Sequence, residues 1–434
     1  MAQAITLFKF HMLTIESLDG EKVVDISNSV AEMDYFENIL EPSITMKLEL
    51  FNVYSLYNEL PIRGGEKVEM EFETASTAWE GDNTINLEMY VYKISNLSSE
   101  QQKEVFTLHL ISKGYFLNET SRCLKKYEKI TIGSHVEQIL TDVLGVDKSR
   151  QKLETTSNSF TFIGNNKKPF HTIQWLAPKS IPTSSGAKGS SGDGPTGQGK
   201  GTAGFLFWEN IDGYNFTSID TLVSKQKSGK SADQGKIYPY VYTPIIDLAL
   251  GSNNFKIIKF QLEKNIDLRK ALRVGMYQNY TYFYDIHSNV LSGYKYDMPK
   301  EVGDKTLAAD GISGVGEFDE KVSRVMFRTS DQGTLDPHGL MTDSGRDDVD
   351  MAKSFARYNL LFTQALNILI PCNTNLKVGD IIWCSFPRLK GGKSTEHDPQ
   401  MSGHYLIREL RHHFEANKNT TSLKLMRDSY GEDL

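Results

Sequence analysis

A glycine, lysine and serine cluster near the C-terminus has the residue types that could bind a phosphate group. Gly391, Gly392, Lys393 and Ser394 match the end of a P-loop, in which backbone N–H groups surround the phosphates and the lysine neutralises their charge. The motif also requires a glycine five positions before its second glycine, and that position is Pro387. We therefore interpret the cluster as a polar hairpin loop and predict no nucleotide cofactor.

Three histidines in the same region have the chemistry of metal ligands, because imidazole binds zinc and other transition metals. His404, His412 and His413 lie near Glu409 and Glu415, but no H-E-x-x-H pattern occurs. Neighbouring residues of a strand point to opposite faces, so His412 and His413 cannot share one ion if this segment is a strand. We predict no metal site.

The remaining reactive residue types form no catalytic pattern. The sequence has no Gly-x-Ser-x-Gly nucleophile elbow, and no pair of carboxylates is spaced so as to name an acid and a base. Cys123, Cys372 and Cys384 are too few for a disulfide framework, so we interpret them as buried apolar residues, with Cys372 and Cys384 as cross-strand neighbours. We interpret the tryptophans as core or interface anchors: Trp79, Trp175, Trp208 and Trp383. We predict no catalytic residues and no enzyme activity.

The composition limits the classes of partner. The 434 residues carry a net charge of −7, whereas a general nucleic-acid-binding protein would normally be basic. No apolar run reaches the roughly 18 residues that a membrane-spanning helix needs, so we expect no stable membrane insertion. The opening residues are not followed by the apolar region of a signal peptide. We expect a globular chain of two to four domains.

The two ends of the chain repeat each other. Residues 65–72 have a counterpart at 379–386, which lies 314 positions later. The other matched segments are 90–95 with 405–410 and 106–110 with 421–425. Each copy is typical of one strand followed by a hairpin of two more strands, because apolar and polar residues alternate in it. The duplication predicts two similar β units in one chain.

The first copy lies in a β-rich segment at 1–116. Residues 13–17 and 22–26 are typical of strands and are joined by a turn that contains Asp19 and Gly20, which is a strong hairpin signal. We therefore interpret 1–116 as the first of the two similar β domains.

Helical patterns follow in 117–240, which we interpret as a small inserted α+β domain. Ser134 and Glu137 have the spacing of a capping box, which predicts a helix from Ser134 that ends near Gly145. A second helix is predicted from Pro169, because proline is favoured at the first helical position. A segment at 180–204, rich in Gly, Ser and Lys, predicts a mobile loop, and 205–216 predicts a hairpin turning at Asp212 and Gly213.

Strand patterns return at 241–289 and, after a helix that opens with Asp347, Asp348 and Asp350, continue to the C-terminus. We assign 241–289 and 347–434 to the second of the two similar β domains, and the family resemblance given below implies that both are tube-forming β-barrels. The Gly- and Asp-rich segment 290–346 is interpreted as a long loop-rich excursion. The predicted fold class is α+β, mainly β.

Three stretches resemble the baseplate hub proteins of contractile-tailed phages. They are the strand entry at 375–382, the closing hairpin at 405–428, and the helix at 132–146 followed by the hairpin at 205–213. The likeness covers nearly the whole chain, in the same order of segments. The segments 180–204 and 290–346 are longer than the family minimum.

The resemblance implies a structural protein of the virion, assembled in the host cytoplasm. It implies a homotrimer whose two β-barrel domains per chain form a pseudo-sixfold ring, since three chains with two copies each give six similar units. The ring would join the hexameric tail tube, or a tube-initiator protein, to the trimeric central spike, with baseplate wedge proteins around it. DNA would pass through the lumen on ejection without specific binding.

Two other functions stay open. One is the base of a secretion-system spike, which has a related double-barrel body but normally continues into further spike domains, and we expect no such extension beyond Leu434. The other is a tail-associated cell-wall hydrolase, for which no lytic motif is present.

The ring also implies properties of particular segments. We expect neighbouring chains to pair through sheet edges and apolar contacts, and 180–204 to be the first site of proteolysis in the free protein. We expect few lysines and arginines on the channel wall. The basic residues of the insert should lie away from it: Lys125, Lys126, Lys167 and Lys168.

Overall fold

The computed structural model describes most of the chain. The described residues are 7–52, 60–75, 84–100, 103–128, 130–183, 201–224, 237–242, 253–264, 267–286, 288–302, 306–307, 316–318, 320–330, 347–388, 397–415 and 418–429. The phosphate-loop candidates from Gly391 to Ser394 lie outside these ranges, as do Trp79 and most of the predicted loop at 180–204.

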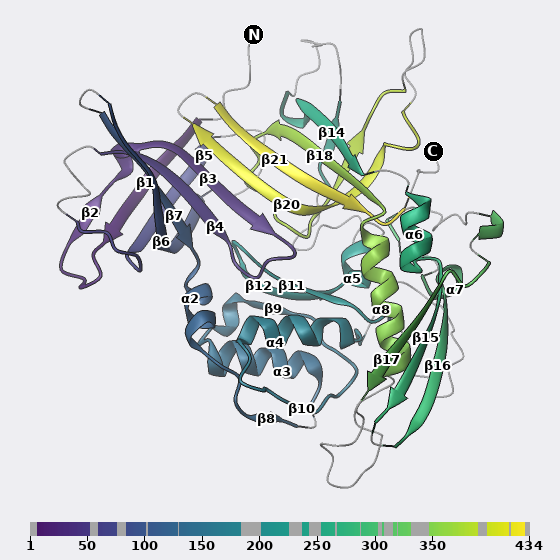
Figure 1. The fold of residues 1–434 in the computed structure, drawn as a ribbon. Coiled ribbons are helices and arrows are strands. Elements are labelled where there is room, and N and C mark those ends of the chain that lie inside the picture. The colour runs from purple at the N-terminus through teal and green to yellow at the C-terminus, as the bar shows by residue number, and fades with distance from the viewer. Residues whose placement is uncertain are drawn as a thin grey trace.

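A 13-stranded sheet built from both ends of the chain forms the upper layer of the molecule (Figure 1). Its strands from the N-terminal end, which we call copy 1, are β1 (Leu7–Glu16), β2 (Val23–Asp25), β3 (Val30–Asn38), β4 (Thr45–Phe51), β5 (Lys67–Ala75), β6 (Thr84–Glu100) and β7 (Lys103–Ile111). Its later strands, which we call copy 2, are β13 (Pro239–Val241), β14 (Lys259–Lys264), β18 (Gln364–Pro371), β19 (Ile381–Ser385), β20 (Gly403–Glu415) and β21 (Lys418–Arg427).

The two copies have the same strand order. Copy 1 runs β3-β4-β7-β6-β5-β1, with β2 at its end, and copy 2 runs β14-β18-β21-β20-β19-β13. One difference is that β1 is antiparallel to β5, whereas β13 is parallel to β19. The duplication predicted from the sequence is therefore present in the topology, but the match of 90–95 with 405–410 is wrong by one residue. Val91 pairs with Leu110 and Ile407 with Leu425, so Val91 corresponds to Ile407 rather than to Leu406.

A glycine turn leads into the repeated strand of copy 1. Gly65 has a φ of 100°, a value that favours glycine. Its N–H donates to the Val91 carbonyl (2.7 Å), and the Val91 N–H donates to the Glu66 carbonyl (2.9 Å). The Glu66 carboxylate accepts the backbone N–H of Arg63 (2.6 Å).

Copy 2 repeats this turn group by group. Gly379 has a φ of 91° and donates to the Ile407 carbonyl (3.1 Å), while the Ile407 N–H donates to the Asp380 carbonyl (2.9 Å). The Asp380 carboxylate accepts the N–H of Lys377 (2.9 Å), three residues before it. Glycine and an acidic side chain are thus retained because the turn needs both a positive φ and an acceptor.

Each copy also contains a β-bulge at the same place. The β6–β7 register shifts between Val91 and Lys93, and the β20–β21 register shifts between Ile407 and Glu409. A bulge bends a strand and increases its local twist. The two copies therefore bend equivalently, although their sequences differ at most positions.

The copies share one hydrophobic core rather than forming two separate cores. It contains Leu48 and Phe106 from copy 1, Ile368 and Tyr405 from copy 2, and Trp208 from the insert below. This continuity follows from the pairing of β3 with β20, which joins the copies into one sheet.

The α+β insert lies beneath the sheet (Figure 1) and has its own core. Its helices are α2 (Lys113–Thr120), α3 (Ile132–Gln138), which continues as the π-helix η3 (Ile139–Val143), η4 (Lys148–Arg150), α4 (Pro169–Leu176), η5 (Ala177–Lys179) and α5 (Ile219–Ser224). Its strands are β8 (Lys126–Tyr127), β9 (Gln151–Leu153), β10 (Phe162–Ile163), β11 (Phe205–Asn210) and β12 (Gly213–Ser218).

The structure confirms the helix from Pro169 and corrects two local predictions. The N-cap of α3 is Thr131, whose side chain accepts the Ser134 N–H (3.4 Å), so Ser134 lies in the first turn of the helix rather than capping it. Asn210 pairs with Gly213, so the hairpin turns one residue earlier than predicted, at Ile211 and Asp212.

A second insert separates β14 from β18 in copy 2. Its elements are α6 (Leu268–Val274), β15 (Gln278–Asp285), β16 (Val290–Asp297), α7 (Met298–Val302), η7 (Gly316–Phe318), β17 (Arg324–Ser330) and α8 (Asp347–Leu361), which begins where the sequence predicted. The strands form a separate sheet in the order β16-β15-β17, beside α8 (Figure 1).

This sheet differs from the predicted loop-rich excursion at 290–346. Residues 291–296 and 324–329 alternate in exposure, with Tyr296 and Met326 buried, but the surrounding Gly and Asp residues obscured that pattern. In addition, β15 pairs with these strands rather than with the main sheet.

Short 3-10 helices occur at η1 (Ser27–Ser29) and η6 (Asn253–Phe255). In the described ranges, no helix is both long enough and apolar enough to cross a membrane.

All three cysteines are buried, as predicted. However, Cys372 follows β18 while Cys384 lies on β19, and β19 pairs with β13 and β20. The expectation that Cys372 and Cys384 are cross-strand neighbours is wrong.

Candidate functional site

The seam between the copies is formed by antiparallel pairing of β3 and β20. The pairs run from Glu409 opposite Asn38 to Glu415 opposite Glu32. On the core side, Tyr35 stacks against His412, with ring centroids 6.0 Å apart. The seam therefore combines backbone hydrogen bonds with a buried aromatic contact.

The outer side of the seam carries a charged cluster. The Arg411 guanidinium donates two hydrogen bonds to Asp34, from Nε to Oδ1 and from Nη2 to Oδ2, each 2.7 Å long. His413 Nδ1 lies 2.9 Å from Asp34 Oδ1 and 3.3 Å from Glu32 Oε1. Such a bidentate arginine–carboxylate pair fixes the register of the two strands as well as adding energy.

The same cluster contains three potential metal ligands. One ligand atom from each of Glu32, Asp34 and His413 lies within 4.8 Å of the others. However, the guanidinium of Arg411 already occupies both oxygens of Asp34, so an ion at this position would have to displace it. The arrangement is that of an ion-paired seam.

The three histidines have different surroundings. His412 is fully buried, its Nδ1 lies 2.8 Å from Thr421 Oγ1, and burial lowers its pKa to about 3. His413 faces the charged cluster on the other side of β20, so adjacent histidines point to opposite faces as predicted. His404 packs edge-on against Trp383, with ring centroids 4.7 Å apart.

A buried glutamate at the end of β3 connects three parts of the chain. Glu37 accepts the Tyr35 hydroxyl (2.6 Å) from copy 1, the Ile211 N–H (3.1 Å) from the insert, and the Val378 N–H (2.9 Å) from copy 2. Its burial raises the pKa of the carboxyl group to about 7, against the effect of these donors.

A second buried glutamate makes the reciprocal connection from the insert. Glu209, on β11, accepts the Ile44 N–H (3.2 Å) and the Ser112 hydroxyl (2.5 Å) from the copy 1 side. Arg150 Nη2 lies 4.0 Å from its other oxygen. Burial raises the pKa of Glu209 to about 7. We call Glu37 and Glu209 the junction carboxyls.

Next to them, Asp212 bridges the insert and copy 2. Its Oδ2 lies 2.6 Å from the ammonium of Lys377 and 3.0 Å from that of Lys152. Burial alone would raise the pKa of Asp212, but hydrogen bonds from these ammonium groups lower it. Asp212 therefore stays ionised and holds the insert against the repeated turn of copy 2.

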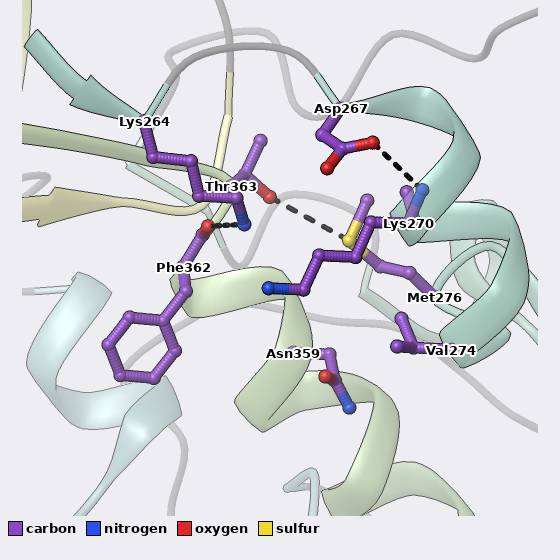
Figure 2. Close-up of a pocket in the computed structure, with 9 residues that line it drawn as sticks. Lys264, Asp267, Lys270, Val274, Met276, Asn359, Phe362 and Thr363 are labelled. Atoms are coloured by element: carbon purple, nitrogen blue, oxygen red, sulfur yellow. Dashed lines mark hydrogen bonds between the residues drawn. The ribbon is translucent and has the colours of Figure 1, made fainter.

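The junction carboxyls have pKa values in the range of general acids and bases. Both carboxyl groups accept hydrogen bonds from backbone N–H and hydroxyl groups of neighbouring elements. These bonds hold the insert at a fixed angle to the copies. Neither lines the pocket in Figure 2. We assign them a structural role.

That pocket, of about 190 Å³, lies between the end of β14, α6 and α8. In Figure 2 the Lys264 ammonium donates to the Phe362 carbonyl, and Asp267 accepts the Lys270 N–H, at 2.9 Å. Lys264 thus satisfies the negative end of α8, and burial lowers its pKa. These groups complete helix ends and do not form a catalytic pair.

The sequence patterns predicted neither the junction carboxyls nor a buried ion cluster. In the cluster, Arg357 of α8 lies 3.4 Å from both Asp220 of α5 and Asp428 after β21. The sequence feature that could have identified the junction carboxyls is a charged residue at a position where the strand pattern predicts a buried side chain. Glu37 falls on the same strand face as the buried Tyr35, and Glu209 ends a run of apolar and aromatic residues.

Of the tryptophans, Trp208 is a core anchor. It is buried, and a Cβ built on Gly379 would lie 2.9 Å from its Cζ2 atom. In contrast, Trp175 is 43% exposed on α4 and packs against the Lys179 ammonium, 5.1 Å from its ring.

Each copy also has an edge strand that is equivalent to one of the two strands of the seam. In copy 1, the part of β6 beyond Tyr90 pairs with β7 alone among the described strands, and Tyr92 and Leu97 on it are 44% and 56% exposed. In copy 2, β14 pairs with β18 alone among the described strands, and its residues alternate between exposed and half-buried.

Comparison with known proteins supports the interpretation of this fold. No family model matches the chain. The chain is 19% identical over 443 residues to a probable baseplate hub protein, gp334, of Vibrio phage KVP40, across 99% of this chain and 96% of that protein. The resemblance to baseplate hub proteins that the sequence predicted is confirmed.

Solved structures show the same fold. A tail protein from Neisseria meningitidis MC58 has a TM-score of 0.53 and 10% identity, over 96% of both chains. The 43 kDa tail protein of prophage MuSo2 from Shewanella oneidensis has a TM-score of 0.50 and 10% identity, over 96% of this chain and 98% of that one. The predicted class, α+β and mainly β, is confirmed.

Proposed function

We propose that this chain is a structural subunit of a phage baseplate hub, located in the tail baseplate of the virion after assembly in the host cytoplasm. Three chains would form a ring that connects the hexameric tail tube, or its initiator, to the trimeric central spike, with wedge proteins outside it. The full-length likeness to a probable baseplate hub protein supports this assignment.

The observation that carries the proposal is the repeated strand order of the two copies within one sheet. Three such chains contain six similar units. A sixfold tube can bind one side of such a ring and a threefold spike the other, without any enzymatic step. The junction carboxyls and Asp212 would keep the copies at a constant angle to the insert.

The stoichiometry of the complex tests this proposal. We expect the purified chain, alone or co-expressed with the spike protein of the same phage, to form a complex with three copies, as measured by multi-angle light scattering. The interface should bury more than about 2,000 Å², as obligate interfaces do. A stable dimer or hexamer of this chain in the complex would contradict the ring.

Two experiments distinguish the hub from the two alternative functions. A secretion-system spike base would be encoded beside secretion genes, and a hub beside tail-tube and wedge genes. A cell-wall hydrolase would release soluble fragments from purified peptidoglycan, whereas we expect no release from the hub.

We also propose that DNA passes the ring without specific binding. On the outer face of the seam, basic residues are matched with acids: Arg411 with Asp34, and Lys424 with Glu409 at 2.7 Å. In the insert, Lys125 and Lys168 pair with Asp142 and Glu119. We expect the trimer to bind duplex DNA weakly at physiological salt, measured by fluorescence anisotropy. Tight, salt-sensitive binding would show a basic channel wall instead.

A further inference from the structure

We infer that the free edge of β14 in one chain pairs with the free edge of β6 in the next chain, in the register that β3 and β20 show within one chain. The inference rests on the proposed ring and names its contact. The partner is a second copy of this chain, joined by antiparallel backbone hydrogen bonds.

The strands of the two copies are equivalent in pairs. β4 and β18 occupy the same position in their copies, because each pairs with the last strand of the copy, β7 or β21. β3 pairs with the other side of β4, and β14 pairs with the other side of β18. β14 is therefore the copy 2 equivalent of β3, and β6 is the copy 1 equivalent of β20.

Pairing of β3 with β20 therefore provides a template inside the molecule. One seam joins copy 1 to copy 2 within the chain. If six similar units close a ring, the same contact must recur between copy 2 of one chain and copy 1 of the next. The edges required for it are β14 and β6, and among the described strands these are the two edges left open at the equivalent positions.

The register follows residue by residue. Opposite β21, Arg411 pairs with Ser422 and His413 with Thr420, and opposite β7, Ser95 pairs with Thr107 and Ser98 with Val105. Because Thr107 is equivalent to Ser422 and Val105 to Thr420, Ser95 corresponds to Arg411 and Ser98 corresponds to His413. Between these positions β6 has one residue more than β20, at the register shift between Ser95 and Ser98.

On the other edge, Asp34 pairs with Lys47 of β4, and Gln261 pairs with Asn367 of β18. Lys47 and Asn367 are equivalent because they precede the matched core residues Leu48 and Ile368. Gln261 therefore corresponds to Asp34. Since His413 lies opposite Asp34 in the seam, Ser98 of one chain should lie opposite Gln261 of the next.

Burial along the two edges agrees with this assignment. In the seam, Met33 and Tyr35 of β3 are buried, at 0% and 4% exposure. Their β14 equivalents, Phe260 and Leu262, are only partly buried. Leu97 on β6 is 56% exposed, while the corresponding region of β20 contains buried His412. The free edges thus expose apolar side chains at positions that the seam covers.

Paired cysteines provide a direct test. Residues directly opposite in an antiparallel pair have Cβ atoms about 4.5–5.5 Å apart, which is close enough for a disulfide after a small adjustment. We expect the variant with both Ser98→Cys and Gln261→Cys to form disulfide-linked dimers and trimers on mild oxidation, seen on non-reducing gels. The native cysteines are all buried and add little background.

A matched control changes only the register. In the variant with Ser98→Cys and Leu262→Cys, the second thiol is one residue along β14 and points to the other face of the sheet. It should give at least tenfold less cross-linked product than the first variant. Equal cross-linking by both variants would overturn the register.

A second variant tests the contact without cross-linking. Leu97→Asp should reduce the trimer fraction at least tenfold at a fixed protein concentration, measured by light scattering. Leu18→Asp is the control, because Leu18 is similarly exposed, at 59%, on the turn between β1 and β2. A trimer unaffected by Leu97→Asp would overturn the contact.

The outcomes separate this inference from the proposed function. A trimer that forms normally but is not cross-linked by Ser98→Cys with Gln261→Cys would overturn the β14–β6 contact and leave the hub ring intact. A chain that stays monomeric, alone and with the spike, would overturn the ring and the contact together. Disulfide-linked dimers without trimers would show a closed twofold pairing and also refute it.

Discussion

Copy 1 and copy 2 share a strand order but differ in what covers their first strand. β3 of copy 1 is covered by β20, while β14 of copy 2 is open among the described strands. A short connection joins β3 to β4, whereas a complete second insert lies between β14 and β18. The glycine turn and the bulge are retained in both copies. The comparison indicates that these two features set the curvature of each copy, while loops and surface residues were free to diverge.

The largest expected effect contrasts the two turn glycines. A Cβ on Gly379 would meet the rigid ring of Trp208 at 2.9 Å, whereas one on Gly65 would meet the flexible end of Leu18 at 3.0 Å. We expect Gly379→Ala to lower the free energy of unfolding by about 2–4 kcal/mol and Gly65→Ala by about 1–2 kcal/mol. Urea unfolding followed by circular dichroism measures both. Equal losses would mean that backbone strain alone decides the cost.

The next effect concerns the junction carboxyls, which join both copies to the insert. Their folded-state pKa values, about 7, lie above the ordinary 4.5, so the folded protein holds more protons than the unfolded chain between these values. The contribution of each group to the free energy of unfolding is therefore fully present below about pH 4.5 and is lost as the pH rises through about 7. We expect this contribution to be on the order of 1–3 kcal/mol for each group.

This pH dependence is measured from the urea midpoint between pH 5 and pH 8. Glu37→Gln and Glu209→Gln should each reduce the slope, because an amide does not titrate. Glu88→Gln is the control, since Glu88 is exposed on β6. A slope that persists in the double variant at the junction would assign the titration to other groups.

The smallest effect compares two ion pairs on the outer face of the seam. Arg411 makes a bidentate pair with Asp34, whose side chain is 10% exposed, whereas Lys424 and Glu409 are 49% and 28% exposed. Arg411→Ala should cost about 1–2 kcal/mol, since it removes both guanidinium hydrogen bonds to the largely buried Asp34 and leaves that carboxylate with His413 as a partner. Lys424→Ala should cost less than about 1 kcal/mol. Thermal unfolding of the two variants would show whether the seam is held by the paired arginine or by backbone pairing alone.

Local pattern was sufficient for elements whose residues interact with near neighbours. The hairpin at Asp19 and Gly20, the helix from Pro169 and the start of α8 at Asp347 depend on turn and capping chemistry that the sequence contains. The local pattern did not identify the N-cap correctly at Ser134, because Thr131, three residues earlier, can cap the same helix. The helix begins at Ile132, which is fully buried, so tertiary packing selects Thr131 as the cap.

The sequence by itself determined the duplication, the mainly β class and the resemblance to baseplate hub proteins. Strand alternation and the glycine turn depend only on residues that are close together in the chain. Only the tertiary structure decided that the copies merge through β3 and β20 into one sheet and one core. It alone placed Glu37 beside Ile211 and Val378, which are 174 and 341 residues away in the chain. The physical reason is that strand pairing and burial of a carboxyl group depend on which distant segments meet, and no local pattern encodes that choice.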